Sequence, residues 1–225
     1  MSGDTPRLSL ADLPTELAIF PLQGALLLPG GELPLHIFEP RYRAMIEDAM
    51  LAERMIGMIQ PRVKEKLEPE DKPNVFGIGC VGKITAHNRL DDGRHLILLT
   101  GVCRFRVKQE LPLFRGYRRV APDYAPFATD LYDDGNAVDR AQLLAALEKY
   151  LQRRKLEADW KSIKETPTPK LVAIMAMVCP FAPSEKQALM EAGDIAARAR
   201  TMITLMRMDA AAPSGQTPDG PSLRH

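Results

Sequence analysis

The sequence has little of several features that mark particular classes of protein. It holds three cysteines, at positions 80, 103 and 179, and aromatic residues make up 6% of it. So few, widely spaced cysteines do not form the disulfide framework of a small secreted domain. The longest apolar run, residues 171–179, is nine residues long, about half of what a membrane span needs. The first ten residues also lack the apolar stretch of a secretory signal, so we predict a cytoplasmic protein that binds no membrane.

The chain also has almost no net charge. Its 30 lysines and arginines nearly balance its 29 aspartates and glutamates, which leaves a formal charge of +1. A molecule so balanced creates no strong field that would draw nucleic acid or an anionic membrane to it. We therefore do not expect the net charge of the protein to attract nucleic acid. Any basic binding site must be a local patch of the surface.

One local exception is a basic stretch at residues 104–119, which is followed by an acidic stretch at 120–139. The first carries six Lys and Arg residues and a single Glu, and the second carries five Asp residues and no Lys or Arg. Neighbouring blocks of opposite charge either pair with each other or stay hydrated. The alternative is a charged recognition surface, and RNA binding through 104–119 is therefore our second hypothesis for the function.

No constellation of residues predicts catalysis or metal binding. The sequence has no C-x-x-C, H-x-x-x-H or H-E-x-x-H spacing for zinc and no G-x-S-x-G elbow for a nucleophilic serine. His36, His87 and His95 fall on expected strands, where packed or solvated imidazoles are the simpler interpretation. Only Cys179 and His36 even weakly suggest an unrecognised enzyme site. We predict a protein that is not an enzyme, with no catalytic residue, no metal and no cofactor.

One glycine-rich segment imitates a nucleotide-binding loop. Residues 77–83, GIGCVGK, match the dinucleotide fingerprint G-x-G-x-x-G and nearly match a phosphate loop. Both motifs need a helix directly after the glycines, with its N-terminus toward the phosphate. Here the run VFGIGCVGKITA is typical of a strand, and a hairpin follows it. We predict extended backbone, in which the glycines allow a bulge or close packing.

What the sequence does contain is a long region typical of strands and turns, from Leu17 to about Asp123. Short apolar or alternating runs are broken there by Pro and Gly. One helix interrupts the strands, because Pro40 suits a first helical position. The apolar residues that share one face of this expected helix are Tyr42, Met45, Ile46, Ala49 and Met50.

The clearest hairpin turns at Asp92-Gly93, a pair that is able to take the positive φ angles of a two-residue turn. That turn would place Leu90 opposite His95. Beyond it, apolar residues alternate with arginines over residues 103–107, which is the pattern of a strand with one dry and one wet face. A barrel or curled sheet follows from strands of this kind.

From Gly135 the apolar period changes to 3.6 residues, so helices are predicted to take over. The pattern indicates four helical segments, of which the first runs through about residue 151. The second begins with Thr168 as its cap, the third with Ser184 as the start of a capping box, and the last follows Asp194 and ends near Met208. The predicted organisation is a flexible start at 1–15, a strand-rich subdomain at 16–125, a helical subdomain at 136–209 and a disordered tail at 210–225.

Several segments carry a resemblance to a known family. They are FPL at 20–22, LPG at 28–30 and LPLHIFEPRYR at 33–43, followed by FGIGCVGKI, the DDGR hairpin, LTGVCRFRV and ARARTMITLM. Together they cover about residues 16–209 and resemble the N-terminal, substrate-binding domain of Lon proteases. That resemblance implies an α+β fold: a PUA-like six-stranded pseudo-barrel with one inserted helix, followed by a C-terminal helical bundle.

The same resemblance implies a function. In the full proteases this module precedes an ATPase and a Ser-Lys peptidase, and it helps to engage unfolded or tagged substrates. The 225 residues here hold no valid phosphate loop and leave no room for those domains. We therefore expect a stand-alone, non-enzymatic module that recognises unfolded or tagged polypeptide, alone or beside a separate protease or chaperone.

A leucine-rich loop is the expected binding element. Leu26, Leu27, Leu28 and Pro29 lead into a Pro-Gly-Gly turn. If this loop projects from the fold, its leucines form an apolar patch that another polypeptide can cover. We predict these residues as the polypeptide-binding loop.

We interpret the residues of the family signature as structural and not as a binding site; they are Phe38, Glu39, Pro40, Arg41 and Tyr42. Its strand leads directly into the expected helix, which Pro40 begins. Glu39 or Arg41 is able to tie that helix to the sheet through paired, partly buried hydrogen bonds. Functional residues are therefore to be sought on loops.

Overall fold

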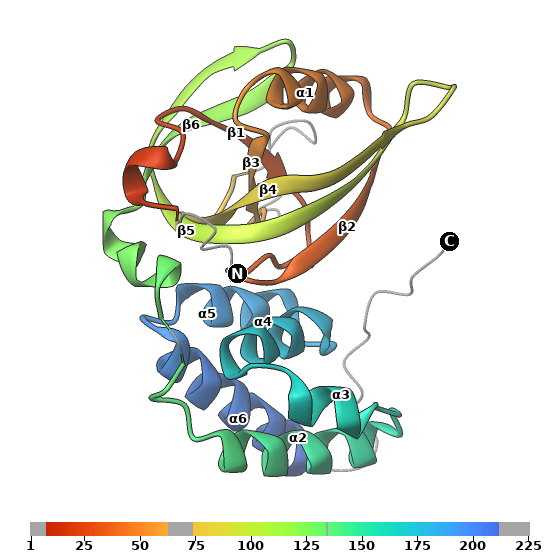
Figure 1. Cartoon of the computed structure of the whole chain (residues 1–225), viewed down its shortest axis with the longest axis vertical. Helices are drawn as coiled ribbons and strands as arrows, with labels where there is room; N and C mark the ends of the chain where they lie inside the picture. The colour runs from red at the N-terminus through yellow and green to blue at the C-terminus, as the bar shows by residue number, and fades with distance from the viewer. Residues whose placement is uncertain (1–7, 63–73, 134, 212–225) are drawn as a thin grey trace, which may run out of the picture. The chain divides into compact units, whose positions relative to one another are not determined.

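The computed structural model describes residues 8–62, 74–133 and 135–211. The chain divides into two compact units, Met1–Tyr132 and Asp133–His225. Strands dominate the first unit and helices the second (Figure 1). The predicted tail at 210–225 lies almost wholly outside the described residues, and so do residues 1–7 of the predicted flexible start.

The first unit is a six-stranded sheet with one inserted helix. Its strands run in the order β2-β5-β4-β3-β1-β6, and β5 also pairs with β6, which closes the sheet on itself. This arrangement confirms the predicted α+β fold with a six-stranded barrel. The elements are β1 (Leu17–Pro21), β2 (Glu32–Ile37), α1 (Pro40–Leu51), β3 (Met55–Ile59), β4 (Ile78–Arg89), β5 (His95–Phe114) and β6 (Tyr117–Asp123), with short 3-10 helices η1 (Leu10–Asp12) and η2 (Ala125–Leu131).

Strand β5 closes the barrel because it pairs with β2 and β4 over its first part and with β6 over its last part. It is 20 residues long and curves through the unit (Figure 1). Up to Arg106 it pairs with β4, and from Arg106 onward it pairs with β6. Register shifts in β4, between Val81 and Gly82 and between Ile84 and Ala86, bend the sheet at this point.

The glycine-rich segment is extended, as predicted. Gly79 and Gly82 lie inside β4, and the next described element is the strand β5, reached through a hairpin. A side chain at Gly79 would bring its Cβ to 2.5 Å from the Met58 carbonyl oxygen and 2.8 Å from the ring of Phe105. Phe105 is fully buried in the barrel core. Gly79 therefore makes room for an aromatic side chain, and the segment does not form a phosphate loop.

The β4–β5 hairpin differs from its prediction by one residue. Arg89 faces His95, and the amide of Leu90 donates to the carbonyl of Arg94, so Leu90 does not lie opposite His95. The loop has three residues, and Gly93 at its end has φ of +81°. A three-residue loop that ends in a left-handed glycine is a common alternative to the two-residue turn, and composition alone does not distinguish the two.

Within residues 8–15, which composition predicted to be loose, Leu13 and Pro14 contact the rest of the first unit. Leu13 is buried, and the hydroxyl of Tyr124 donates to the Pro14 carbonyl at 3.0 Å. Residues 10–12 form the short helix η1. A long-range contact to η2 and the barrel thus orders a segment whose local sequence has no apolar periodicity.

The second unit contains more helices than the four predicted. Its helices are α2 (Arg140–Arg154), α3 (Trp160–Glu165), α4 (Thr168–Val178), α5 (Pro183–Glu191) and α6 (Ile195–Ala211). The short α3 was missed, although Asp159 caps it by accepting from the amides of Lys161 and Ser162. Six residues are too few for an apolar period to be visible. In the described part of the chain, no helix combines the length and apolar content needed to cross a bilayer.

The predicted helix caps have mixed outcomes. Asp194 is confirmed, because its carboxylate accepts from the amide of Ala197 at 2.6 Å. The prediction of Ser184 as a cap is wrong. Helix α5 begins at Pro183, and Glu185 accepts from the amide of the cap residue Ala182. Proline at a first helical position moves the start of this helix one residue earlier than the serine suggested. Thr168 is likewise the first residue of α4 and not its cap.

Candidate functional site

The leucine loop does not form the exposed patch that was expected. Leu26, Leu27 and Leu28 are only 2%, 0% and 0% exposed. The loop lies on β5, where the Gly30 amide donates to the Gly101 carbonyl and the Gly101 amide donates to Gly31. A side chain at Gly101 would clash with the Leu28 backbone. The leucines are core residues of the barrel because a glycine on β5 lets their backbone approach closely.

The signature residues contact one another and also the sheet. Glu39 and Arg41 form an ion pair at 2.9 Å, and the Arg41 guanidinium lies over the ring of Tyr42. Tyr42 is buried and its ring centroid is 4.3 Å from that of Phe20 on β1, which ties α1 to the barrel. Phe38 is 61% exposed. The signature thus contains structural contacts and one exposed aromatic side chain.

Strand β5 has one face toward the barrel interior and one face outward. Residues His95, Ile97, Leu99 and Cys103 are buried. The alternate residues Leu96, Leu98, Thr100 and Val102 are exposed or partly exposed. Because successive side chains of a strand point to opposite sides, these four lie on one outer surface.

Neighbouring strands extend this outer surface. Pro34 and Ala86 lie opposite Leu98, and His36 lies opposite Leu96. Directly paired residues share a face of the sheet, and Phe38 follows His36 by two positions with the two rings 6.0 Å apart. We call this surface the outer sheet face; its residues are Pro34, His36, Phe38, Ala86, Leu96 and Leu98.

The outer sheet face is accessible and mainly apolar, although the exposed Asn88 of β4 also lies opposite Leu96. Leu96 is 42% exposed and Phe38 is 61% exposed. Large apolar side chains that cluster on a surface are typical of protein-binding sites. The outer sheet face is therefore a better candidate for polypeptide binding than the leucine loop.

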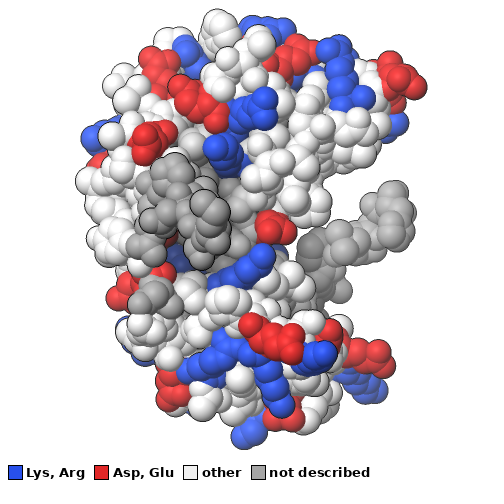
Figure 2. All heavy atoms as spheres, in the orientation of Figure 1, with Lys and Arg blue, Asp and Glu red and all other residues white. Residues whose placement is uncertain are grey.

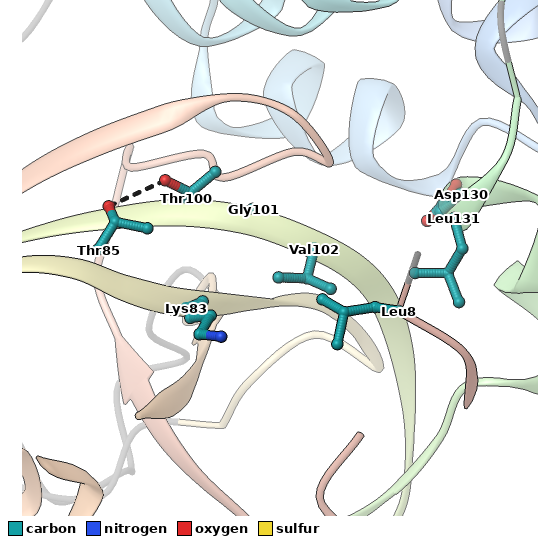
Figure 3. Close-up of a pocket in the computed structure, with 8 residues that line it drawn as sticks. All are labelled: Leu8, Lys83, Thr85, Thr100, Gly101, Val102, Asp130 and Leu131. Carbon is teal, nitrogen blue, oxygen red and sulfur yellow. Dashed lines mark hydrogen bonds between the residues drawn. The ribbon is translucent and has the colours of Figure 1, made fainter. Parts of the chain in front are cut away.

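A hollow of about 310 Å³ continues this face along β5. Figure 3 shows Thr85 and Thr100 joined by a hydrogen bond at one end and the side chains of Leu8, Val102 and Leu131 at the other. Lys83, Gly101 and Asp130 complete the lining. Lys83 lies directly opposite Thr100 across the strands, so the two side chains are on the same face.

One wall of the hollow is held by a buried ion pair. The Asp130 carboxylate on η2 accepts from the guanidinium of Arg104 at 2.9 Å and 2.8 Å and from the Arg104 amide. The side chains of Arg104 and Asp130 are only 0% and 7% exposed, and the guanidinium also lies over the ring of Phe127. A paired guanidinium and carboxylate of this geometry fixes η2 against β5.

The basic stretch at 104–119 is largely neutralised by acidic partners, some of them in the acidic stretch. Its ion pairs are Arg104 to Asp130, Lys108 to Asp123, Arg115 to Glu47 and Asp48, Arg118 to Glu110, and Arg119 to Glu16. In the face shown in Figure 2, positive and negative side chains of each unit are intermixed. The stretch does not present the open cationic surface that a phosphate backbone requires.

Two of the predicted strand histidines form a pair. The Nε2 of His87 and the Nδ1 of His95 are 2.7 Å apart, and their rings are stacked. Burial lowers the pKa of His95 below its usual range, and the positive charges of His87 and Arg89 lower it further. His95 is buried and His87 is exposed, and among the described residues no three acidic, cysteine or histidine side chains gather to hold a metal ion.

The cysteines have properties of structural residues. Cys80, Cys103 and Cys179 are free and buried. Burial raises the pKa of the Cys103 thiol and of the Cys179 thiol to about 12. Thiols with such pKa values form little of the reactive thiolate at neutral pH.

Several site residues were missed at the level of sequence. Lys83 was considered only as the last residue of a failed phosphate loop, and Thr85 and Thr100 carried no motif. The alternation seen in the sequence covered only residues 103–107, and it was wrong for Arg104, which was expected on the wet face but is fully buried and paired with Asp130. What was not visible is the β4–β5 register that places Lys83 beside Thr100, because strand pairing is set by the tertiary fold.

The fold and the site together define a small closed barrel followed by a helical unit, with an exposed apolar surface on the barrel. The family model described as the ATP-dependent protease La (LON) substrate-binding domain matches residues 16–208. The chain belongs to this family, as its signature segments predicted.

Curated relatives are whole proteases. The Lon protease of Anaeromyxobacter dehalogenans (strain 2CP-C) is 23% identical over 207 residues, covering 91% of this chain and 24% of the relative. Lon protease 2 of Myxococcus xanthus is 25% identical over 205 residues, covering 87% of this chain and 24% of the relative. The chain therefore spans about a quarter of the length of these relatives.

Solved structures show the same fold. A Lon N-terminal domain protein from Xanthomonas campestris has a TM-score of 0.61 at 20% identity, with 85% of this chain and 98% of that chain covered. The N-terminal domain of the Mycobacterium avium complex Lon protease has a TM-score of 0.58 at 18% identity and the same coverage. Both are similar to this chain in architecture.

Proposed function

We propose that this chain is a non-catalytic module that binds unfolded polypeptide on the outer sheet face. The observation that carries the proposal is the row of apolar side chains on the outside of β2, β4 and β5, with Phe38 and Leu96 substantially exposed. Apolar segments of an unfolded chain gain roughly 25 cal/mol for each Å² of apolar surface they bury there. Folded proteins keep such segments inside, so the surface selects unfolded clients.

The family supports the same function. Its description is that of a substrate-binding domain, and the curated relatives are proteases. We propose that the clients are unfolded or tagged polypeptides and that the module works beside a protease or chaperone. Its buried, free cysteines suit a reducing compartment such as the cytoplasm.

The absence of catalysis is part of the proposal. The thiols of Cys103 and Cys179 are buried with raised pKa values. His36, the other group considered for an enzyme site, lies on the outer sheet face, where its ring contacts Phe38. Both observations favour binding over reaction.

The test is binding of a permanently unfolded protein, reduced and carboxymethylated, measured by fluorescence anisotropy with the whole chain. Leu96→Asp and Phe38→Asp each introduce a charge into the outer sheet face. We expect each to weaken binding by about tenfold or more, because burying an unpaired charge against apolar surface is strongly unfavourable.

Leu113→Asp is the matched control. Leu113 is on the same strand and is 57% exposed, but it lies beyond the part of β5 that pairs with β2. This variant should bind as the unchanged chain does. Absence of saturable binding, or equal losses in all three variants, contradicts the proposal.

A further inference from the structure

The hollow beside the outer sheet face combines groups that an apolar patch does not need. Three of its side chains are apolar, those of Leu8, Val102 and Leu131. Two others carry hydroxyl groups, Thr85 and Thr100, and one carries an ammonium group, Lys83. Figure 3 shows the apolar side chains together at one end of the hollow and the hydroxyl groups at the other. Such a combination suits a ligand that is apolar at one end and anionic at the other.

Lys83 gives the lining of the hollow a positive charge, and the exposed Glu32 of β2 lies opposite Thr100 on the side away from Lys83. Asp130 also lines the hollow, but both of its carboxylate oxygens accept from the buried guanidinium of Arg104. Lys83 is exposed, and it forms no ion pair with any acidic side chain among the described residues. Among the side chains that line the hollow, the ammonium of Lys83 is therefore the charge without a partner of opposite sign in the lining.

The hydroxyl groups add a directed donor. The hydroxyl of Thr85 donates to the Leu98 carbonyl at 3.2 Å and lies 3.0 Å from that of Thr100. With the Thr85 proton on the Leu98 carbonyl, Thr100 is the donor of the Thr85–Thr100 bond, so Thr100 donates to a ligand by exchanging that bond for one to the ligand. Thr100 lies directly opposite Lys83, so both donors reach the same anionic group.

We propose that this hollow binds the C-terminal residue of a client polypeptide. Its carboxylate accepts from Lys83 and Thr100, and its apolar side chain lies against Leu8, Val102 and Leu131. A chain terminus fits better than an internal Asp or Glu, because only the terminal residue joins a carboxylate and an apolar side chain at one carbon atom. The volume of about 310 Å³ is of the size that one or two residues fill. This inference rests on the proposed function and adds a preference for chain ends.

The experiment uses the whole chain and two labelled decapeptides of one sequence, both ending in Val-Leu. One has a free C-terminal carboxylate and the other a C-terminal amide. We expect the acid to bind about tenfold more tightly, which is typical of a hydrogen bond to a charged group. Lys83→Met should remove this difference while leaving the affinity for the amide unchanged. Lys108 lies on β5 outside the hollow. Lys108→Met should therefore leave the difference in affinity between the acid and the amide unchanged.

The outcomes separate this inference from the proposed function. If the unfolded protein binds but the acid and the amide bind equally, or neither peptide binds, or Lys83→Met leaves their difference unchanged, the C-terminal site is refuted and polypeptide binding stands. If the unfolded protein does not bind either, the proposed function itself fails. Because Lys83 is an exposed side chain, its substitution should leave the fold intact, which circular dichroism checks.

Discussion

At the scale of single residues, the barrel contains buried charges whose partners are far away in sequence. Arg104 is completely buried, and its guanidinium is paired with Asp130, which is 26 residues further along the chain. Removing one partner of such a pair leaves the other as an uncompensated buried charge, which is far less favourable than removing both.

We predict that Asp130→Asn lowers the free energy of unfolding of the first unit by about 3 to 5 kcal/mol. The double substitution Arg104→Met with Asp130→Leu should recover much of this loss, because it leaves no buried charge. Native-state hydrogen exchange of the β5 amides measures the effect in the first unit alone. Equal losses in the single and double variants would mean that packing, and not charge, dominates.

His95 predicts a dependence of stability on pH. Its ordinary pKa is 6.5 and its pKa in the fold is lower, chiefly because of burial. The unfolded chain therefore takes up a proton that the folded chain resists, so stability is full above about pH 6.5 and falls as the pH drops below it. Of the charged groups around the ring, His87, Arg89 and Arg43 lower this pKa, and Glu47 on α1 raises it.

The measurement is urea unfolding between about pH 7.5 and pH 5. His95→Gln should flatten the pH dependence, because glutamine does not titrate. His36→Gln is the control, since His36 lies exposed on the outer sheet face. An unchanged slope in His95→Gln would show that other groups carry the dependence.

At the scale of elements, the glycines of β4 decide how the barrel closes. Gly77 and Gly79 belong to the same motif, but a Cβ at Gly77 meets nothing within 4 Å, whereas one at Gly79 meets Met58 and Phe105. One glycine is therefore required by packing and the other is not.

We predict that Gly79→Ala destabilises the first unit by about 1 to 3 kcal/mol, because overpacking forces backbone or ring shifts. Gly77→Ala should change stability by less than about 0.5 kcal/mol. Hydrogen exchange of the β4 amides compares the two variants directly. Equal effects of the two would refute the argument from close packing.

At the scale of the whole molecule, near-neutral charge and an apolar site predict binding that depends little on salt. The affinity for unfolded protein should change by less than about threefold between roughly 0.05 and 0.5 M salt, because apolar burial is not screened. Binding through phosphate contacts would weaken by orders of magnitude over a narrower range of salt. Anisotropy titrations with the unfolded protein and with a single-stranded RNA test both expectations, and tight, salt-sensitive RNA binding would restore the alternative hypothesis.

Much of the architecture was predictable from the sequence. The inserted helix at Pro40, the extended glycine segment and the change to helices after Gly135 all follow from local patterns of apolar residues, Pro and Gly. The predictions were wrong where two local conformations suit the same residues about equally well. Examples are the length of the turn at Asp92-Gly93 and the start of α5 at Pro183.

The sequence by itself determined the kinds and order of the elements, because φ preferences and apolar periods act between near neighbours. Only the tertiary structure decided the use of individual side chains. It buried Leu27 against Gly82 and Leu28 against Gly101, and it gave the basic stretch its acidic partners. It also brought Lys83, Thr100 and Asp130 around one hollow. The physical reason is that burial and charge pairing depend on strand register and barrel closure, which join residues far apart in the chain.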